Sequence, residues 1–161
     1  MRQEQMLYDG AIRTIVLSEQ GSNSRDHSAQ AYRDQAAGLV YTWLKLDRLP
    51  SIESYIHHRW MDHASEGGLD LGVRRGKHAD TAAAREATAT VCCELTAHGV
   101  TCTPDATSKP AWDVFRVPEI SEQANLVDWT RTYIPAHCWE GVQPAATEAD
   151  LEESQGSEDH D

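Results

Sequence analysis

Apolar residues recur at the spacing of an amphipathic helix along most of the chain. This spacing predicts five helices, over about 4–19, 28–48, 52–65, 80–97 and 122–133. Helix-ending residues agree with several of these bounds, since Gly21 follows the first segment, Pro50 the second and Gly99 the fourth. The pattern therefore predicts a mainly helical protein.

The pattern changes after Gly99. Residues 100–103 and 112–117 are rich in β-branched and aromatic side chains, as strands are, and the connector between them holds turn-forming residues. Together they predict a β-hairpin over about 100–117. The expected fold class is α+β, mainly α with one β-hairpin. Three predicted helices followed by a two-stranded wing also give the order of a winged-helix domain.

Length and charge predict how the chain is organised. The chain has 161 residues, enough for one domain, and a formal net charge of -12. Residues 147–161 carry seven acidic side chains and no Lys or Arg. Too little apolar surface follows Trp139 to offset the entropy of ordering. We therefore predict one globular domain over 1–141 and a disordered acidic tail over 142–161.

Hydropathy and cysteine usage indicate a compartment. No stretch approaches the roughly 20 apolar residues of a membrane span, and the N-terminus lacks the apolar core of a signal peptide. We therefore expect a cytoplasmic protein that does not enter a membrane. Cys92 and Cys93 are adjacent in a predicted helix, so only Cys102 and Cys138 are placed to pair easily, and in a reducing cytosol they stay thiols. Cys92 is expected to pack beside Leu95.

The densest group of titratable residues is 57–63. In a helix, His58 and Asp62 lie one turn apart, which is the spacing that a metal site on one helix needs. A complete site would need ligands from elsewhere, such as His27 or Asp26. A metal-dependent enzyme centred on His58 and Asp62 is therefore one alternative function, and a solvent-exposed ion pair is the plainer interpretation.

A single basic run precedes the predicted helix at 80–97. Its side chains, together with the amides at the start of that helix, could hold an anion; they are Arg74, Arg75, Lys77 and His78. A winged-helix-like regulator that binds nucleic acid is therefore a second alternative. The negative net charge argues against it, because nucleic-acid binding depends on neutralising phosphates. Such a run is most often a solvated loop.

Five tryptophans are more than a small domain buries completely, and exposed Trp favours interfaces. Trp139, after the last predicted helix, and Trp60 are candidate anchors for a partner, and Cys93 lies on a face of small residues that suits close helix packing. We therefore expect a non-catalytic adaptor, regulatory or assembly protein that acts by protein–protein binding. Its partner is another protein or a second copy of the chain, and no cofactor is expected.

Overall fold

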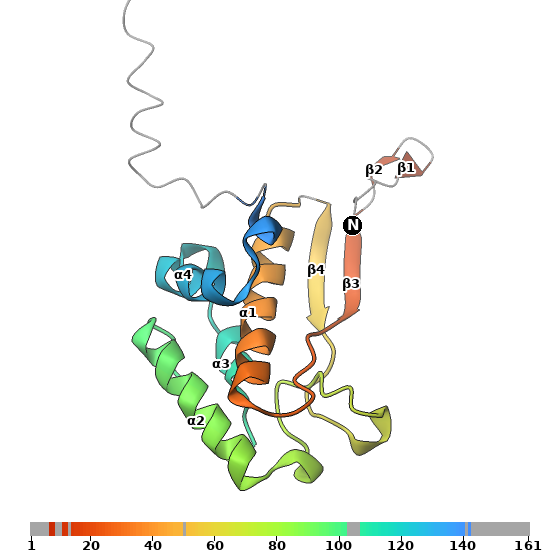
Figure 1. Cartoon of the computed structure of the whole chain (residues 1–161). Coiled ribbons are helices and arrows are strands. Elements are labelled where there is room, and N and C mark those ends of the chain that lie inside the picture. The colour runs from red at the N-terminus through yellow and green to blue at the C-terminus, as the bar shows by residue number, and fades with distance from the viewer. Residues whose placement is uncertain are drawn as a thin grey trace, which may run out of the picture.

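A computed structural model describes residues 7–8, 11–12, 14–49, 51–102, 107–140 and 142. The strands and helices follow one another in the order β1 (Leu7–Tyr8), β2 (Ala11–Ile12), β3 (Ile15–Gln20), α1 (Ala29–Leu46), β4 (Ile52–His57), α2 (Ala82–Ala97), α3 (Pro110–Phe115) and α4 (Ala124–Tyr133) (Figure 1). Short 3₁₀ turns lie at Ala64–Glu66, Lys77–Ala79, Ile120–Glu122 and Ala136–Trp139. The result is a mixed α+β fold, as the sequence predicts.

The helices build the hydrophobic core around α1. Helices α2, α3 and α4 all pack against α1, which lies between α4 and the strands (Figure 1). Each helix contributes fully buried apolar side chains, among them Val40, Leu95, Val114 and Leu126. Helix α1 begins after Ser28, whose hydroxyl accepts a hydrogen bond from the amide of Ala31 at 3.1 Å.

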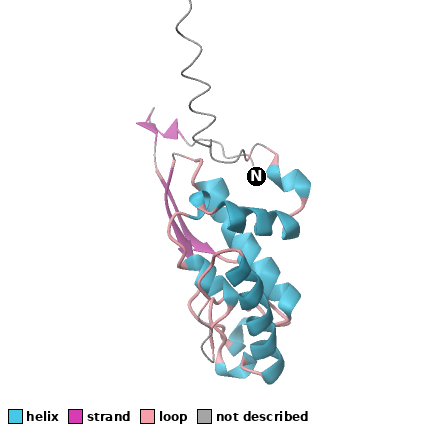
Figure 2. Cartoon of the chain, turned by 90° about the vertical axis from the view of Figure 1, so that its left-hand side faces the viewer, coloured by secondary structure: helices cyan, strands magenta, loops and turns pink. Residues whose placement is uncertain are grey.

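Strands β3 and β4 form a two-stranded parallel sheet, in which Leu17 lies opposite Tyr55. Parallel neighbours need a crossover connection, and α1 supplies it, so β3, α1 and β4 form a βαβ unit. Strands β1 and β2 pair with each other, antiparallel. Figure 2 shows the strands along one side of the helices.

Three predicted helices are confirmed and two are wrong. The segments 28–48, 80–97 and 122–133 contain α1, α2 and α4. The segment 4–19 holds strands, and 52–65 begins with strand β4 and continues as a loop and a 3₁₀ turn. Both segments contain short apolar runs that fit either period, and their isoleucine residues favour strands once a parallel partner is present.

The predicted hairpin over 100–117 is also wrong. Residues 100–102 form no strand, and the second half of the segment is helix α3. Pro110 occupies the first turn of α3, where its fixed φ suits a helix and its missing N–H costs nothing. With neither the middle helix nor the wing present, the order of a winged-helix domain is not the order of this fold.

Cys92 and Cys102 form a disulfide, with their Cα atoms 5.5 Å apart. The sequence predicts instead that Cys102 and Cys138 are the pair placed to join easily. That expectation is wrong, because the chain turns back after α2 and brings Cys102 beside Cys92 within this helix. Cys93 and Cys138 are free. Disulfides are most common in oxidising compartments, and the cytoplasmic location stays a prediction.

The predicted acidic tail lies almost entirely outside the described residues. Its first residue, Val142, is buried against the helical core. Residues 143–161 are not described, so the disordered tail and the division at residue 141 stay predictions. Among the described residues no helix combines the length and apolar character that crossing a membrane requires.

Candidate binding site

The β3–β4 sheet is covered incompletely. No described side chain of β3 or β4 is buried, although parallel strands are normally covered on both faces. The pairing of Val16 with Ser54, together with the alternation of side chains along strands, places Val16 and Ile56 on one face. Val16 is 51% exposed and Ile56 52% exposed. This surface, defined by Val16 and Ile56, is called the open face below.

An aromatic row runs along the opposite face of β4. Tyr55 packs edge-on against Trp43 of α1, with 6.3 Å between ring centroids, and His57 lies 6.1 Å from Phe115 of α3. Beyond the end of β4, Trp60 packs edge-on against Trp112, with centroids 4.6 Å apart. Trp60 is still 51% exposed. The row attaches the sheet to the helices and ends in an exposed indole.

The loops that follow β3 and β4 meet at the carboxyl ends of the strands in a buried ionic cluster. We define this cluster as Ser24, His27, Asp62, Asp70 and Lys109. The ammonium of Lys109 lies 2.6 Å from the Oδ2 of Asp62, and both side chains are fully buried. Lys109 also donates to the hydroxyl of Ser24 at 2.8 Å. The cluster therefore joins the loop after β3, the loop after β4 and the segment before α3.

His27 extends this cluster. Its Nε2 lies 3.4 Å from Asp70, and its Nδ1 lies 3.2 Å from the hydroxyl of Tyr32. Burial lowers the pKa of His27, the nearby charge of Lys109 lowers it further, and Asp70 opposes both effects. Burial also lowers the pKa of Lys109, with Asp62 acting in the other direction. The environment thus favours a neutral His27 imidazole.

A second buried cation stabilises the neighbouring loop. The guanidinium of Arg75 donates to the hydroxyl of Thr88 at 2.6 Å and to the carbonyl oxygen of Ser108 at 2.8 Å. It also forms an ion pair with Asp80 at 3.4 Å. Removing a single partner from such a buried pair leaves an uncompensated charge, so these pairs fix the loops in one arrangement.

The ionic cluster has some of the chemistry of a metal site. Ligand atoms of His27, Asp62 and Asp70 all lie within 4.8 Å of one another, and imidazole with carboxylates suits zinc and other divalent ions. However, Lys109 already neutralises Asp62, and its ammonium would repel a second cation. The arrangement is therefore best explained as an internal ion pair that holds the loops.

The structure separates the residues that the sequence grouped as candidates for metal or nucleic-acid binding. His58 and Asp62 lie on a loop rather than a helix, and Asp62 is joined by His27 and Asp70 instead of His58. In the basic run, Arg75 is buried, and Arg74 is half-buried and donates to the hydroxyl of Thr107. Only Lys77 and His78 of the run are exposed.

The partner-binding candidates are also divided. Trp60 and Cys93 are exposed, as a contact with a partner requires. Trp139 is buried, and its prediction as an exposed anchor is wrong. After α4 the chain turns back onto α1, where Trp139 packs edge-on against Tyr41 with ring centroids 5.2 Å apart. Arg131 covers the indole at 4.5 Å.

Sequence reasoning missed Ser24, Asp70 and Lys109, which complete the ionic cluster. One signal was Gly72, because a Cβ at this position would lie 2.5 Å from the amide nitrogen of Asp62. The amide of Gly72 donates to Asp62 Oδ1 at 2.8 Å. A glycine between two apolar residues thus marks a close approach of backbones, although it does not identify the lysine that lies 37 positions further along the chain.

The fold and the candidate site define an α+β protein with a parallel βαβ unit, an open sheet face and a buried ionic cluster at the carboxyl ends of its strands. Residues 1–142 match the family model described as "Family of unknown function (DUF5722)". The chain belongs to this family. No curated protein and no solved structure matches it.

Proposed function

We propose that this chain is a protein-binding module whose partner completes the β3–β4 sheet. The observation that carries the proposal is that no described side chain of either strand is buried. Exposed parallel strands are unusual, because their backbone and apolar side chains are normally covered by further strands and helices. A partner that covers them removes this apolar surface from water, which favours association.

The strand edges support the same mode of binding. Among the described residues, β3 pairs only with β4, so the outer edge of each strand has no strand partner. Such an edge presents backbone donors and acceptors to which an extended segment can add, and main-chain hydrogen bonds then give affinity. The apolar side chains of the open face give this partner a surface to pack on.

Exposed aromatic side chains also lie near the carboxyl end of β4, in the aromatic row of the opposite face. Trp60 and Phe115 are 51% and 42% exposed, and aromatic anchors contribute much of the binding energy at many interfaces. The net charge of -12 favours a basic partner, because complementary charge speeds encounter. The proposal retains the adaptor or regulatory role expected from the sequence and replaces Trp139 by the sheet as the contact surface.

The test compares partner capture by three forms of the full chain. The double variant V16K/I56K places two charges on the open face, and L69K places one on an exposed loop residue as a control, since Leu69 is 53% exposed. We expect the amount of a captured partner protein to be equal with the wild type and L69K, and at least tenfold lower with V16K/I56K. Slower amide hydrogen exchange in β3 and β4 after addition of that protein would locate the contact. Equal capture by all three forms would refute the proposal.

The other two functions expected from the sequence have less support. Lys109 competes with a metal for Asp62, and of the four side chains in the basic run Arg75 is buried and Arg74 is half-buried. Stoichiometric zinc in the purified chain, lost in H27A, would favour the metal-dependent alternative. Retention on heparin that falls in K77A would favour nucleic acid.

A further inference from the structure

A buried carboxylate lies against the disulfide. The Oδ2 of Asp113 is 3.2 Å from the Sγ of Cys102 and 3.9 Å from the Sγ of Cys92. The Asp113 side chain is fully buried, and its Oδ1 accepts a hydrogen bond from the guanidinium of Arg116 at 2.6 Å. One carboxylate oxygen is thus held by Arg116, and the other faces the two sulfurs.

This geometry suits two thiols better than it suits a disulfide. A thiol carries a hydrogen that it can donate to a carboxylate oxygen, whereas a disulfide sulfur has only lone pairs to present. Hydrogen bonds to a charged acceptor are also stronger than neutral ones. Asp113 therefore stabilises the reduced pair relative to the oxidised pair, which a purely structural disulfide does not need.

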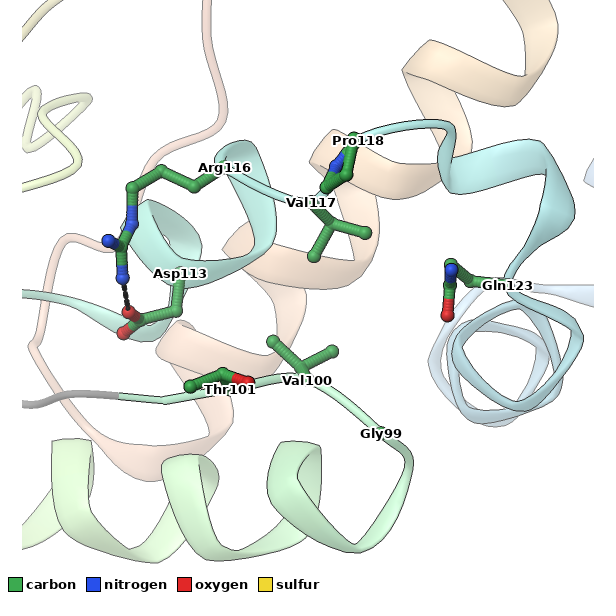
Figure 3. A pocket seen from close by; sticks show the side chains of 8 residues that line it. All are labelled: Gly99, Val100, Thr101, Asp113, Arg116, Val117, Pro118 and Gln123. Carbon is green, nitrogen blue, oxygen red and sulfur yellow. Dashed lines mark hydrogen bonds and ion pairs between the residues drawn. The ribbon is translucent and has the colours of Figure 1, made fainter.

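Access to the two sulfurs is unequal. Cys92 is buried in α2, whereas Cys102 is half-buried in the segment that follows this helix. A pocket of about 300 Å³ is lined in part by Thr101, Asp113 and Arg116, and neither cysteine is among its lining residues. Figure 3 shows Arg116 reaching across to Asp113, with Thr101, the neighbour of Cys102, at the wall of the pocket. Because Cys102 is the less buried of the two cysteines, an external thiolate reaches Cys102 first.

We propose that Cys92 and Cys102 form a reversible dithiol–disulfide site, in which Asp113 is a positioning residue that favours the dithiol. The co-reactant is a dithiol reductant. Its thiolate attacks Cys102 Sγ, the Cys92–Cys102 bond breaks, and Cys92 leaves as a thiolate that takes a proton from solvent. The second thiol of the reductant, as a thiolate, then attacks the first sulfur of the reductant in the mixed disulfide. The bond to Cys102 breaks, and Cys102 leaves as a thiolate that is protonated. Two electrons and two protons reach the protein, and the reductant leaves as a disulfide.

The experiment measures the reduction equilibrium of the full chain in glutathione buffers, by alkylating free thiols and counting them by mass spectrometry. All forms carry C93S and C138S, so that only the pair is counted. We expect the parent chain to change from oxidised to reduced within the range of these buffers. A structural disulfide would stay oxidised throughout, and that result would overturn the proposal.

Two variants test the role of Asp113 by shifting the equilibrium in opposite directions. D113N removes the charged acceptor, so we expect the equilibrium constant for reduction to fall about tenfold, which corresponds to about 30 mV. R116Q removes the Arg116 cation from beside the carboxylate, so we expect the constant to rise. An unchanged or higher constant in D113N would overturn the role of Asp113. If D113N does not fold, R116Q alone tests the role of Asp113, because the Arg116 side chain is 46% exposed and its replacement should be tolerated. An unchanged or lower equilibrium constant in R116Q would then overturn that role.

Discussion

The helical half and the sheet half of this molecule are stabilised in different ways. The helical half, α1 to α4, surrounds a core of fully buried apolar side chains. The sheet half consists of β3, β4 and the loops that follow them. Its described strands bury no side chain completely, and the buried groups of its loops include polar pairs, Asp62 with Lys109 and His27 with Asp70.

This difference separates stability from binding. A hydrophobic core lowers the free energy of the folded state without regard to orientation, because the effect depends on apolar area. A buried ion pair contributes little net stability but strongly disfavours alternative arrangements of its loops. The sheet half is therefore fixed in shape while its apolar surface stays available, which is what a docking surface for a partner strand needs.

The largest effect is expected from K109M, which tests whether the ion pair holds the sheet half. Methionine fills similar volume but leaves the fully buried Asp62 without its cation. We expect the free energy of unfolding to fall by about 3–5 kcal/mol, as for other broken buried pairs. Urea unfolding followed by tryptophan fluorescence measures the loss.

The matched control is the double variant D62L/K109M, which removes both charges. Replacing both partners of a buried pair by apolar side chains is often close to neutral, so the double variant should be more stable than K109M. A K109M variant within about 1 kcal/mol of the wild type would show that the pair does not hold these loops.

A pair of apolar truncations compares the two halves directly. Leu126 is fully buried in α4, so L126A should lower the free energy of unfolding by about 2–5 kcal/mol. Ile56 is 52% exposed on the open face, and I56A should change the free energy of unfolding by no more than about 0.5 kcal/mol. Urea unfolding measures both, and losses of equal size would mean that the sheet is as well covered as the helical core.

The two halves also differ in how well the sequence predicts them. Helices α1, α2 and α4 were predicted within a few residues because their apolar spacing, capping residues and terminating glycine or proline are all local signals. The sequence predicts helices where strands β3 and β4 lie, because each strand is short and its stabilising partner is far away in the chain, as in the pairing of Val16 with Ser54, 38 positions apart. Local patterns do not contain that pairing.

The candidate site shows the same limit. Trp60 could be identified from its type and position, and Asp62 and His27 were both named as candidate ligands. Lys109 could not be connected to Asp62, because a single lysine before a proline carries no sign of burial, and charged residues are rarely buried unless paired. The prediction that Trp139 is exposed is wrong for a related reason. The turn after α4 returns the indole to the core, and this turn depends on packing against α1.

The smallest expected effect concerns pH and the sheet half, through His57 on β4. Burial lowers the pKa of His57, opposed in part by the hydrogen bond that its Nε2 donates to the carbonyl oxygen of Leu71 at 2.9 Å. The unfolded chain therefore binds the proton more readily than the folded chain, and stability rises with pH across that interval. The contribution of the neutral His57 to stability is fully present above the ordinary pKa of 6.5, and it is lost as the pH falls through the lowered pKa of His57 in the folded state.

The variant H57Q isolates this effect, because glutamine can still donate to Leu71 but does not titrate. Urea midpoints measured at about pH 7.5 and about pH 5.5 should fall with pH in the wild type and fall less in H57Q. Part of the decrease should persist in the variant, since the pKa of His27 is also lowered by burial. The same decrease in both forms would show that His57 is solvated, and that β4 is even more open to a partner than its contacts with Phe115 indicate.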